Sequence, residues 1–250
     1  STLSDNFLHY EQLISESSHD IIWPELPENT AAGLCYTSGT TGNPKGALYS
    51  HRSTVLHALT TSLNLGPSLG DGMKVLPVVP LFHVNAWGLP YAAPLTGTSL
   101  IFPGPNLDGA SLFDLMDQEN VNSAWGVPTV WLGLLEEIRK QERVPSQFQN
   151  VVIGGSAAPK SMIEEFESLG ITVCHAWGMT EMSPVGTQGF LPGSMKKALS
   201  QDEQISKKCY QGRRVFGVDL KIVDENDNSL PHDGIASGEL YVRGNAIISG

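Results

Sequence analysis

Short apolar runs alternate with amphipathic stretches through the middle of this 250-residue chain. Residues 123–127, 151–154 and 171–176 have the length and composition of buried strands. The stretches 128–142 and 159–169 between them have the length of helices, and a proline near the first turn suits a helix start. Strands that alternate with helices predict an α/β fold, with a mostly parallel sheet flanked by helices.

The same reasoning assigns further elements on the N-terminal side. Residues 31–36 have the pattern of a short buried strand, and residues 51–65 that of a helix capped near Ser50. Residues 85–95 are apolar enough for a helix, although a glycine and a proline lie inside it. The other predicted elements are strands at 74–79 and 99–102 and a helix at 109–119.

The last part of the chain has a different pattern. Residues 218–223 and 239–242 alternate as antiparallel strands do, and Asn-Asp-Asn at 226–228 and Asp-Gly at 233–234 supply turns. The parallel sheet is therefore expected to be followed by a β-rich antiparallel tail.

Composition narrows the classes of partner. The formal net charge of −11 argues against a nucleic acid or an anionic membrane, because both call for a basic face. No run reaches the ~18 apolar residues of a membrane span. Cys35, Cys174 and Cys209 form neither a disulfide framework nor a zinc template, so buried thiols in a reducing compartment are expected. A cytoplasmic protein is the resulting expectation.

A segment rich in glycine and hydroxyl groups, Tyr-Thr-Ser-Gly-Thr-Thr-Gly-Asn-Pro-Lys-Gly at 36–46, follows the first predicted strand. Its glycines let backbone N–H groups approach an anion, its hydroxyls add uncharged donors, and Lys45 adds a cation for phosphate oxygens. It differs from the common P-loop, because Pro44 and Gly46 flank the lysine, which therefore does not open a helix. A surface linker seldom carries this ordered series, so the segment predicts a polyphosphate site.

Residues 36–46 resemble the phosphate-loop signature of the adenylate-forming superfamily, which includes acyl-CoA synthetases, luciferases and the adenylation domains of peptide synthetases. Residues 80–85, Pro-Leu-Phe-His-Val-Asn, resemble the second motif of the family. Gly-Gly-Ser-Ala-Ala-Pro at 154–159 resembles its adenine-pocket turn, and a helix N-terminus suits a nucleotide. Trp-Gly-Met-Thr-Glu at 177–181 matches a further motif, in which the family usually has tyrosine at the place of Trp177. The resemblance extends over nearly the whole chain.

The resemblance implies roles for individual residues. His83 is expected near the reacting carboxylate, and the ring of Trp177 is expected to stack on adenine. Thr180 is expected to contact the α-phosphate, and Glu181 to ligate Mg²⁺, an ion that prefers oxygen ligands. The implied catalytic residues are His83, Thr180 and Glu181. The implied ATP-binding residues are Thr37, Ser38, Gly39, Thr40, Thr41, Gly42, Lys45, Gly155, Ser156, Ala157, Trp177, Gly178 and Thr180. The implied acyl pocket consists of His83, Trp87, Val127, Gly154, Gly178 and Met179, with Gly178 leaving room for the acyl chain.

The family pattern continues with an Asp for the ribose hydroxyls, an Arg, and a hinge to a small domain that carries a catalytic lysine. The chain is therefore expected to be a fragment of the large N-terminal domain, inactive or nearly so by itself. Its nucleotide- and acyl-binding α/β portion is expected at 1–190 and the start of a β-rich subdomain at 191–250, with the lysine-bearing domain absent.

The implied activity is that of an acyl-CoA synthetase, a fatty-acid–CoA ligase. A carboxylate reacts with ATP to give acyl-AMP and pyrophosphate, and coenzyme A then takes the acyl group; ATP, Mg²⁺ and coenzyme A are the implied cofactors. Amino-acid-activating members have Asp at the place of His83, and Trp87 and Trp131 add apolar surface, so a small- to medium-chain fatty or thioether-like acid is expected. Another acceptor than coenzyme A, a non-catalytic nucleotide-binding module and a homodimer are alternatives left open.

Overall fold

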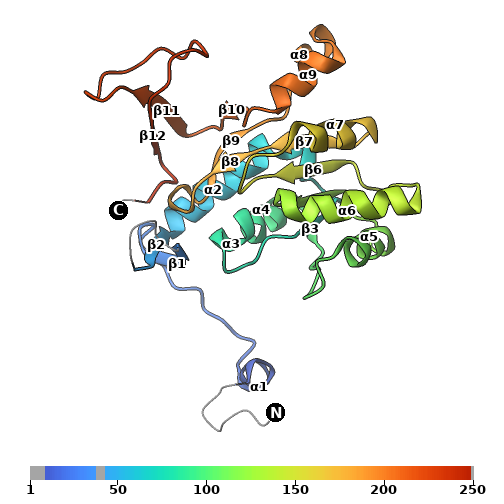
Figure 1. Ribbon diagram of the computed structural model, residues 1–250. Coiled ribbons are helices and arrows are strands. Elements are labelled where there is room, and N and C mark those ends of the chain that lie inside the picture. Colours follow the sequence, from blue (N-terminus) through green and yellow to red (C-terminus); the bar gives the residue numbers. More distant parts are fainter. Residues whose placement is uncertain (1–8, 38–42, 249–250) are drawn as a thin grey trace.

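The computed structural model describes residues 9–37 and 43–248 of the chain. At its centre lies a parallel five-stranded sheet with the order β4-β3-β5-β6-β7, as Figure 1 shows, which confirms the predicted α/β fold. The strands are β3 (Lys74–Pro77), β4 (Ser99–Leu100), β5 (Ser123–Gly126), β6 (Asn150–Ile153) and β7 (Thr172–His175). Because the strands are parallel, the connections that leave the carboxyl ends of β5, β6 and β7 share one rim of the sheet.

Successive strand residues point to opposite faces of the sheet and enter two separate hydrophobic clusters. Leu76, Ala124 and Val151 face the first cluster, which includes side chains of α5, α6 and α7. Val75 and Trp125 face the second, which includes side chains of α3 and α4. Both faces are therefore buried, which explains why the strands are apolar throughout. The helices around the sheet are α2 (His51–Asn64), α3 (Val84–Trp87), α4 (Leu89–Thr96), α5 (Gly109–Gln118), α6 (Pro128–Gln141) and α7 (Lys160–Ser168).

Three antiparallel units accompany the parallel sheet (Figure 1): β1–β2, β8–β9–β10 and β11–β12. The last of them confirms the predicted β-rich tail. The bounds of these strands are β1 (Ala31–Thr37), β2 (Lys45–Ser50), β8 (Trp177–Gly178), β9 (Val185–Gln188), β10 (Arg213–Arg214), β11 (Val218–Val223) and β12 (Glu239–Gly244). The remaining short elements are α1 (Tyr10–Glu16), α8 (Gly193–Ala198), α9 (Gln201–Lys208) and the 3-10 turns η1 (Gly66–Ser68) and η2 (Thr180–Met182).

The start of α2 follows the signal in the sequence. The Ser50 hydroxyl accepts a hydrogen bond from the Ser53 N–H, and the Ser53 hydroxyl accepts one from the Ser50 N–H, both at 3.0 Å. This reciprocal pair satisfies two N–H groups at the helix N-terminus, and confirms the predicted cap. Within the described residues, no helix is long and apolar enough to cross a membrane.

The predicted helix at 85–95 is wrong in its first turn. The four residues of α3 have φ values of 49°, 50°, 46° and 58°, so this turn is left-handed, and a right-handed helix begins only at Leu89. Such a conformation costs about 1–2 kcal/mol for each residue with a Cβ. It is held by tertiary and local bonds: the Ala86 N–H donates to the Pro80 carbonyl at 3.3 Å and the Gly88 N–H to the Asn85 carbonyl at 2.9 Å.

The predicted buried strand at 31–36 exists as β1, but most of it is exposed. Only Cys35 in this strand is buried, at 3 % exposure. Its partner in the antiparallel hairpin is β2, in which Lys45 pairs with Thr37. A two-stranded hairpin packs only one of its faces against the rest of the protein. Apolar residues on its other face are therefore exposed, and an apolar sequence did not indicate a buried strand here.

Candidate functional site

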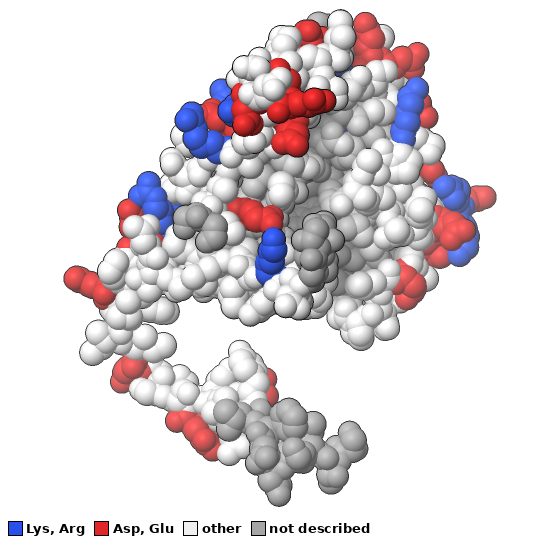
Figure 2. Space-filling model, turned by 60° about the vertical axis from the view of Figure 1, so that its left-hand side comes forward, with Lys and Arg blue, Asp and Glu red and all other residues white. Residues whose placement is uncertain are grey.

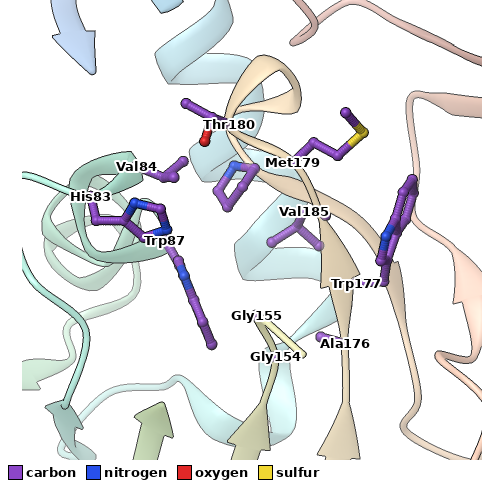
Figure 3. A pocket seen from close by; sticks show the side chains of 12 residues that line it. His83, Val84, Trp87, Gly154, Gly155, Ala176, Trp177, Met179, Thr180 and Val185 are labelled. Carbon is purple, nitrogen blue, oxygen red and sulfur yellow. The ribbon is translucent and has the colours of Figure 1, made fainter. Parts of the chain in front are cut away.

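A pocket lies where β6 and β7 give way to turns, at the carboxyl edge of the parallel sheet (Figure 3). Ligands of open α/β sheets bind at this edge. Its walls come from α3, from the turn after β6 and from the segment that follows β7. Its volume of about 180 Å³ is below the ~300–1,000 Å³ common for small-molecule sites. The lining residues are His83, Val84, Trp87, Gly154, Gly155, Ala176, Trp177, Gly178, Met179, Thr180, Pro184 and Val185.

The α3 turn supplies the first wall. His83 is exposed at its start, whereas Trp87 is only 8 % exposed, and Figure 3 shows the indole extending toward the Gly154–Gly155 turn. A Cβ placed on Gly154 would lie 3.0 Å from Cη2 of Trp87. Trp87 and Gly154 thus lie close together, and both line the pocket.

The turn after β6 supplies the second wall. Gly155 has a φ of 78°, and a Cβ there would lie 2.9 Å from Cγ1 of Val127, so glycine fits both the backbone and the space. Val127 itself packs behind the turn and is not among the lining residues. Ser156 and Ala157 are exposed on the same turn, next to the pocket rather than lining it.

The end of this turn is held by a buried histidine. The Ala158 N–H donates to Nε2 of His175 at 3.2 Å, and Nδ1 of His175 lies 3.2 Å from the Lys208 carbonyl. Burial lowers the pKa of His175, which favours the neutral imidazole that this arrangement needs. An Nδ1–H donating to Lys208 and an Nε2 accepting from Ala158 satisfy both ring nitrogens.

The segment after β7 supplies the third wall. Here Trp177 and Gly178 form β8, Thr180 is buried, and Glu181 is partly exposed beside it in η2. Gly178 lines the pocket, and a Cβ on it would lie 2.0 Å from the Pro184 carbonyl oxygen. The close approach of two backbone segments by itself therefore requires glycine at this position.

The hairpin carries the ends of the glycine-rich segment. Thr37 ends β1 and Lys45 opens β2, and the Thr37 hydroxyl donates to the Lys45 carbonyl at 3.5 Å. Lys45 is exposed, and neither residue lines the pocket. The predicted ATP-binding residues Ser38, Gly39, Thr40, Thr41 and Gly42 lie outside the described residues.

A second buried histidine, His57 on α2, supports the pocket from behind. Its Nε2 accepts a hydrogen bond from the N–H of Val185 at 3.1 Å. A Cβ on Gly88 would lie 2.7 Å from its ring. Burial lowers the pKa of His57 to about 3, so the ring is neutral at physiological pH and can accept this bond. His57 thus ties α2 to the third wall and leaves no space for a side chain at Gly88.

The pocket has a mixed polar and apolar lining. None of the described residues that line it is Asp, Glu, Lys or Arg. The face of the molecule drawn in Figure 2 has a hollow, with mainly uncharged walls and charged side chains along the rim. The described part of the chain also contains no group of three or more His, Cys, Asp and Glu that could hold a metal ion. Glu181 as a single carboxylate fits Mg²⁺ only if phosphate oxygens complete the shell, which is common for this ion.

Sequence reasoning missed three lining residues, and two residues expected at the acyl pocket, Val127 and Trp131, do not line the pocket. The missed residues Ala176, Pro184 and Val185 are apolar and lie close to motif positions in the sequence, and only that proximity could have indicated them. Trp131, expected near the acyl chain, is fully buried in the cluster of α5, α6 and α7, on the opposite face of the sheet. The helical spacing of α6 points its indole into that core.

The model of a family described as AMP-binding enzyme matches residues 2–250. The medium-chain-fatty-acid–CoA ligase of Ectopseudomonas oleovorans is 51 % identical over 96 % of the chain and 44 % of its own length. The 3-methylmercaptopropionyl-CoA ligase of Ruegeria lacuscaerulensis is 49 % identical, with the same coverages. Among solved structures, the inhibitor-bound N-terminal domain of FACL13 from Mycobacterium tuberculosis superposes with a TM-score of 0.82 at 20 % identity, over 96 % of this chain and 56 % of that one. The chain thus spans less than half the length of these two relatives.

Proposed function

The chain belongs to the AMP-binding enzyme family, and on this basis we propose that the complete protein is an acyl-CoA synthetase. Its first step joins a carboxylate oxygen to the α-phosphorus of ATP and releases pyrophosphate. In the second step, the sulfur of coenzyme A attacks the acyl carbon and releases AMP. The observation that carries this proposal is that three family motifs, far apart in the sequence, border one uncharged pocket.

The roles proposed for the described residues come from the family motifs and are compatible with their places around that pocket. Thr180 lines the pocket and Glu181 follows it in η2, and a hydroxyl and a carboxylate suit the α-phosphate and the Mg²⁺ that arrives with ATP. Trp177 and the Gly154–Gly155 turn offer a flat ring and exposed backbone to adenine. Because the lining residues in the described part carry no charge, Lys45 and Mg²⁺ are left to balance the phosphates.

The proposed acid has an apolar tail of small to medium length, fatty or thioether-containing. His83, Trp87 and Met179 present no carboxylate that could pair with a substrate amine, so an amino acid is disfavoured. The two relatives act, by their names, on medium-chain fatty acids and on 3-methylmercaptopropionate. A small, uncharged pocket suits the same kind of tail.

We also propose a cytoplasmic location and a division of the chain near residue 190. Cys35 and Cys174 are buried free thiols, as expected in a reducing compartment. The helices around the parallel sheet precede residue 190, except for α9, which packs on α7.

Pyrophosphate exchange by the complete protein tests the proposed activity. Butanoate, octanoate, 3-methylthiopropanoate and palmitate would be compared with several amino acids, each in the presence of Mg-ATP. The apolar acids of small to medium length should support exchange, and adding coenzyme A should yield the thioester. If none of the acids supports exchange, the protein is not an adenylate-forming ligase; if exchange occurs without thioester, the acceptor is another molecule.

Trp87→Ala tests whether the indole limits chain length. Removing it should deepen the pocket, so the ratio of kcat/KM for decanoate to that for butanoate should rise roughly tenfold, since each well-placed methylene contributes about 1–3 kcal/mol. Trp23→Ala is the matched control, because this tryptophan is 82 % exposed and is not among the lining residues. An unchanged ratio, or a wild type that already prefers the longer acid, would show that Trp87 does not set the limit.

A further inference from the structure

Tyr49 is a buried polar residue to which the proposed reaction assigns no part. It lies on β2, four residues after Lys45, and is only 2 % exposed. Its hydroxyl donates to the backbone carbonyl of Thr180 at 2.7 Å, across 131 positions of sequence. This bond connects the hairpin that carries the glycine-rich segment with the Thr180–Glu181 pair at the edge of the pocket.

A neighbouring residue connects the same face of the hairpin with the other side of the pocket. Cys35 lies on β1, and its thiol donates to Oδ1 of Asn85 at 3.7 Å. Asn85 belongs to the left-handed α3 turn that presents His83 and Trp87. The buried face of the hairpin therefore contacts two of the three pocket walls, one through Cys35 and one through Tyr49.

The chemistry of Tyr49 suits a permanent donor. Burial raises the pKa of its phenol above the ordinary value, and nearby Cys35 and Glu181 act in the same direction. The hydroxyl therefore keeps its proton. A hydrogen bond inside a protein is electrostatically stronger than one in water, because the local dielectric constant is lower.

We propose that Tyr49 is a positioning residue for adenylate formation, which holds Thr180 and Glu181 at a fixed place relative to the β1–β2 hairpin. This inference rests on the proposed function. Tyr49 is not among the residues that line the pocket, so it acts through the backbone of Thr180. The consequence for rate follows from geometry, since a shift of about 1 Å in the reacting groups lowers a rate by about 100-fold.

Tyr49→Phe in the complete protein removes the hydroxyl and keeps the ring that packs in the second hydrophobic cluster. Tyr241→Phe is the matched control: it also removes a tyrosine hydroxyl bond, to Asp227 at 3.1 Å, on the exposed strand β12. Pyrophosphate exchange with the best acid should fall about tenfold or more in kcat for Tyr49→Phe, on the scale that misplacement produces. The Mg²⁺ concentration for half-maximal rate should rise, and the KM for the acid should stay the same. If Tyr49 served only stability, the variant would have a lower folded fraction, and the Mg²⁺ concentration for half-maximal rate would not change.

A second measurement requires no activity. The amides of Met182 and Ser183 donate to the carbonyls of Met179 and Thr180 within η2. Their hydrogen exchange should become faster in Tyr49→Phe and stay unchanged in Tyr241→Phe. If the wild type supports exchange of pyrophosphate and Tyr49→Phe matches it in kcat and in Mg²⁺ dependence, the inference is overturned. If the wild type is inactive with every acid, the proposed function fails. Separately, η2 amides that exchange equally fast in the wild type and in Tyr49→Phe would refute a positioning effect of the bond from Tyr49 to Thr180.

Discussion

The two faces of the parallel sheet differ in how regular their cover is. Helices α5, α6 and α7 cover one face, and each has right-handed geometry and packs apolar side chains into a single cluster. The other face carries α3, with four non-glycine residues at positive φ, and the buried imidazole of His57 beside the pocket. Unfavourable local features are concentrated on the side that forms the site, and the regular side supplies stability to hold them.

Phe166→Ala should show the difference between the two faces most clearly. Phe166 is fully buried in the cluster of α5, α6 and α7, so its truncation should lower the free energy of unfolding by about 3–5 kcal/mol. The kinetics of the protein that remains folded should not change, because Phe166 is not among the residues that line the pocket at the carboxyl edge of the sheet. Urea unfolding measures the free energy of unfolding, and rates at increasing concentrations of the carboxylic acid substrate measure kcat/KM. Leu132→Ala on α6, where the side chain is 53 % exposed, should cost about 0.5 kcal/mol or less. A tenfold loss of kcat/KM in folded Phe166→Ala would mean that the faces are not independent.

Acidification should act on the pocket face through His57. Its pKa is about 3 in the folded chain and 6.5 in the unfolded chain, so the unfolded state binds the proton more readily. The contribution of the neutral His57 ring to the free energy of unfolding is complete well above pH 6.5 and is lost as the pH falls from about 6.5 toward 3. Between pH 7 and pH 5, this amounts to about 2 kcal/mol of unfolding free energy.

His57→Gln is the comparison for this pH effect. Urea unfolding from pH 7 to pH 5 should show a flatter dependence in the variant, whatever its stability at pH 7. Equal slopes in both proteins would show that another group titrates in this range.

Gly154→Ala should have a small effect on stability and a specific effect on the site. The added methyl group would lie 3.0 Å from Trp87, so the indole must shift by a few tenths of an ångström. The KM for the acid should rise roughly tenfold, equivalent to about 1.4 kcal/mol, whereas unfolding should change by about 1 kcal/mol or less. Gly193→Ala is the control, since a Cβ there meets nothing within 4 Å. If both variants bind the acid equally well, the close contact between Gly154 and Trp87 does not shape the acid site.

The regular face could be predicted because each element carries its own signal. α6 begins with a proline, α5 has Asp108 as its cap, and the strands are apolar on both sides. The α3 turn could not be predicted in this way, because Asn85 and Ala86 do not by themselves indicate a left-handed turn, and their hydrogen bonds to Cys35 and Pro80 are visible only in the structure.

The residues of the site likewise divide into some that the sequence could predict and some that it could not. Gly154, Gly155 and residues 177–180 could be predicted because they belong to ordered motifs, and the structure brings them together around one pocket. Tyr49 and His57 lie in segments whose only local signal is a strand or a helix, and their partners are 131 and 128 positions away. Contacts at such separations leave no periodic trace in a single sequence.

The three walls of the pocket come from three separate connections at the rim of the sheet, and none of them is a strand of the parallel sheet itself. Trp87 and Met179 can therefore be substituted without a change in the strands of the parallel sheet. Under the proposed function, the substrate range can drift by a few substitutions in these walls while the reaction stays the same. Two relatives of nearly equal identity to this chain bear the names of different acids, as such drift would produce.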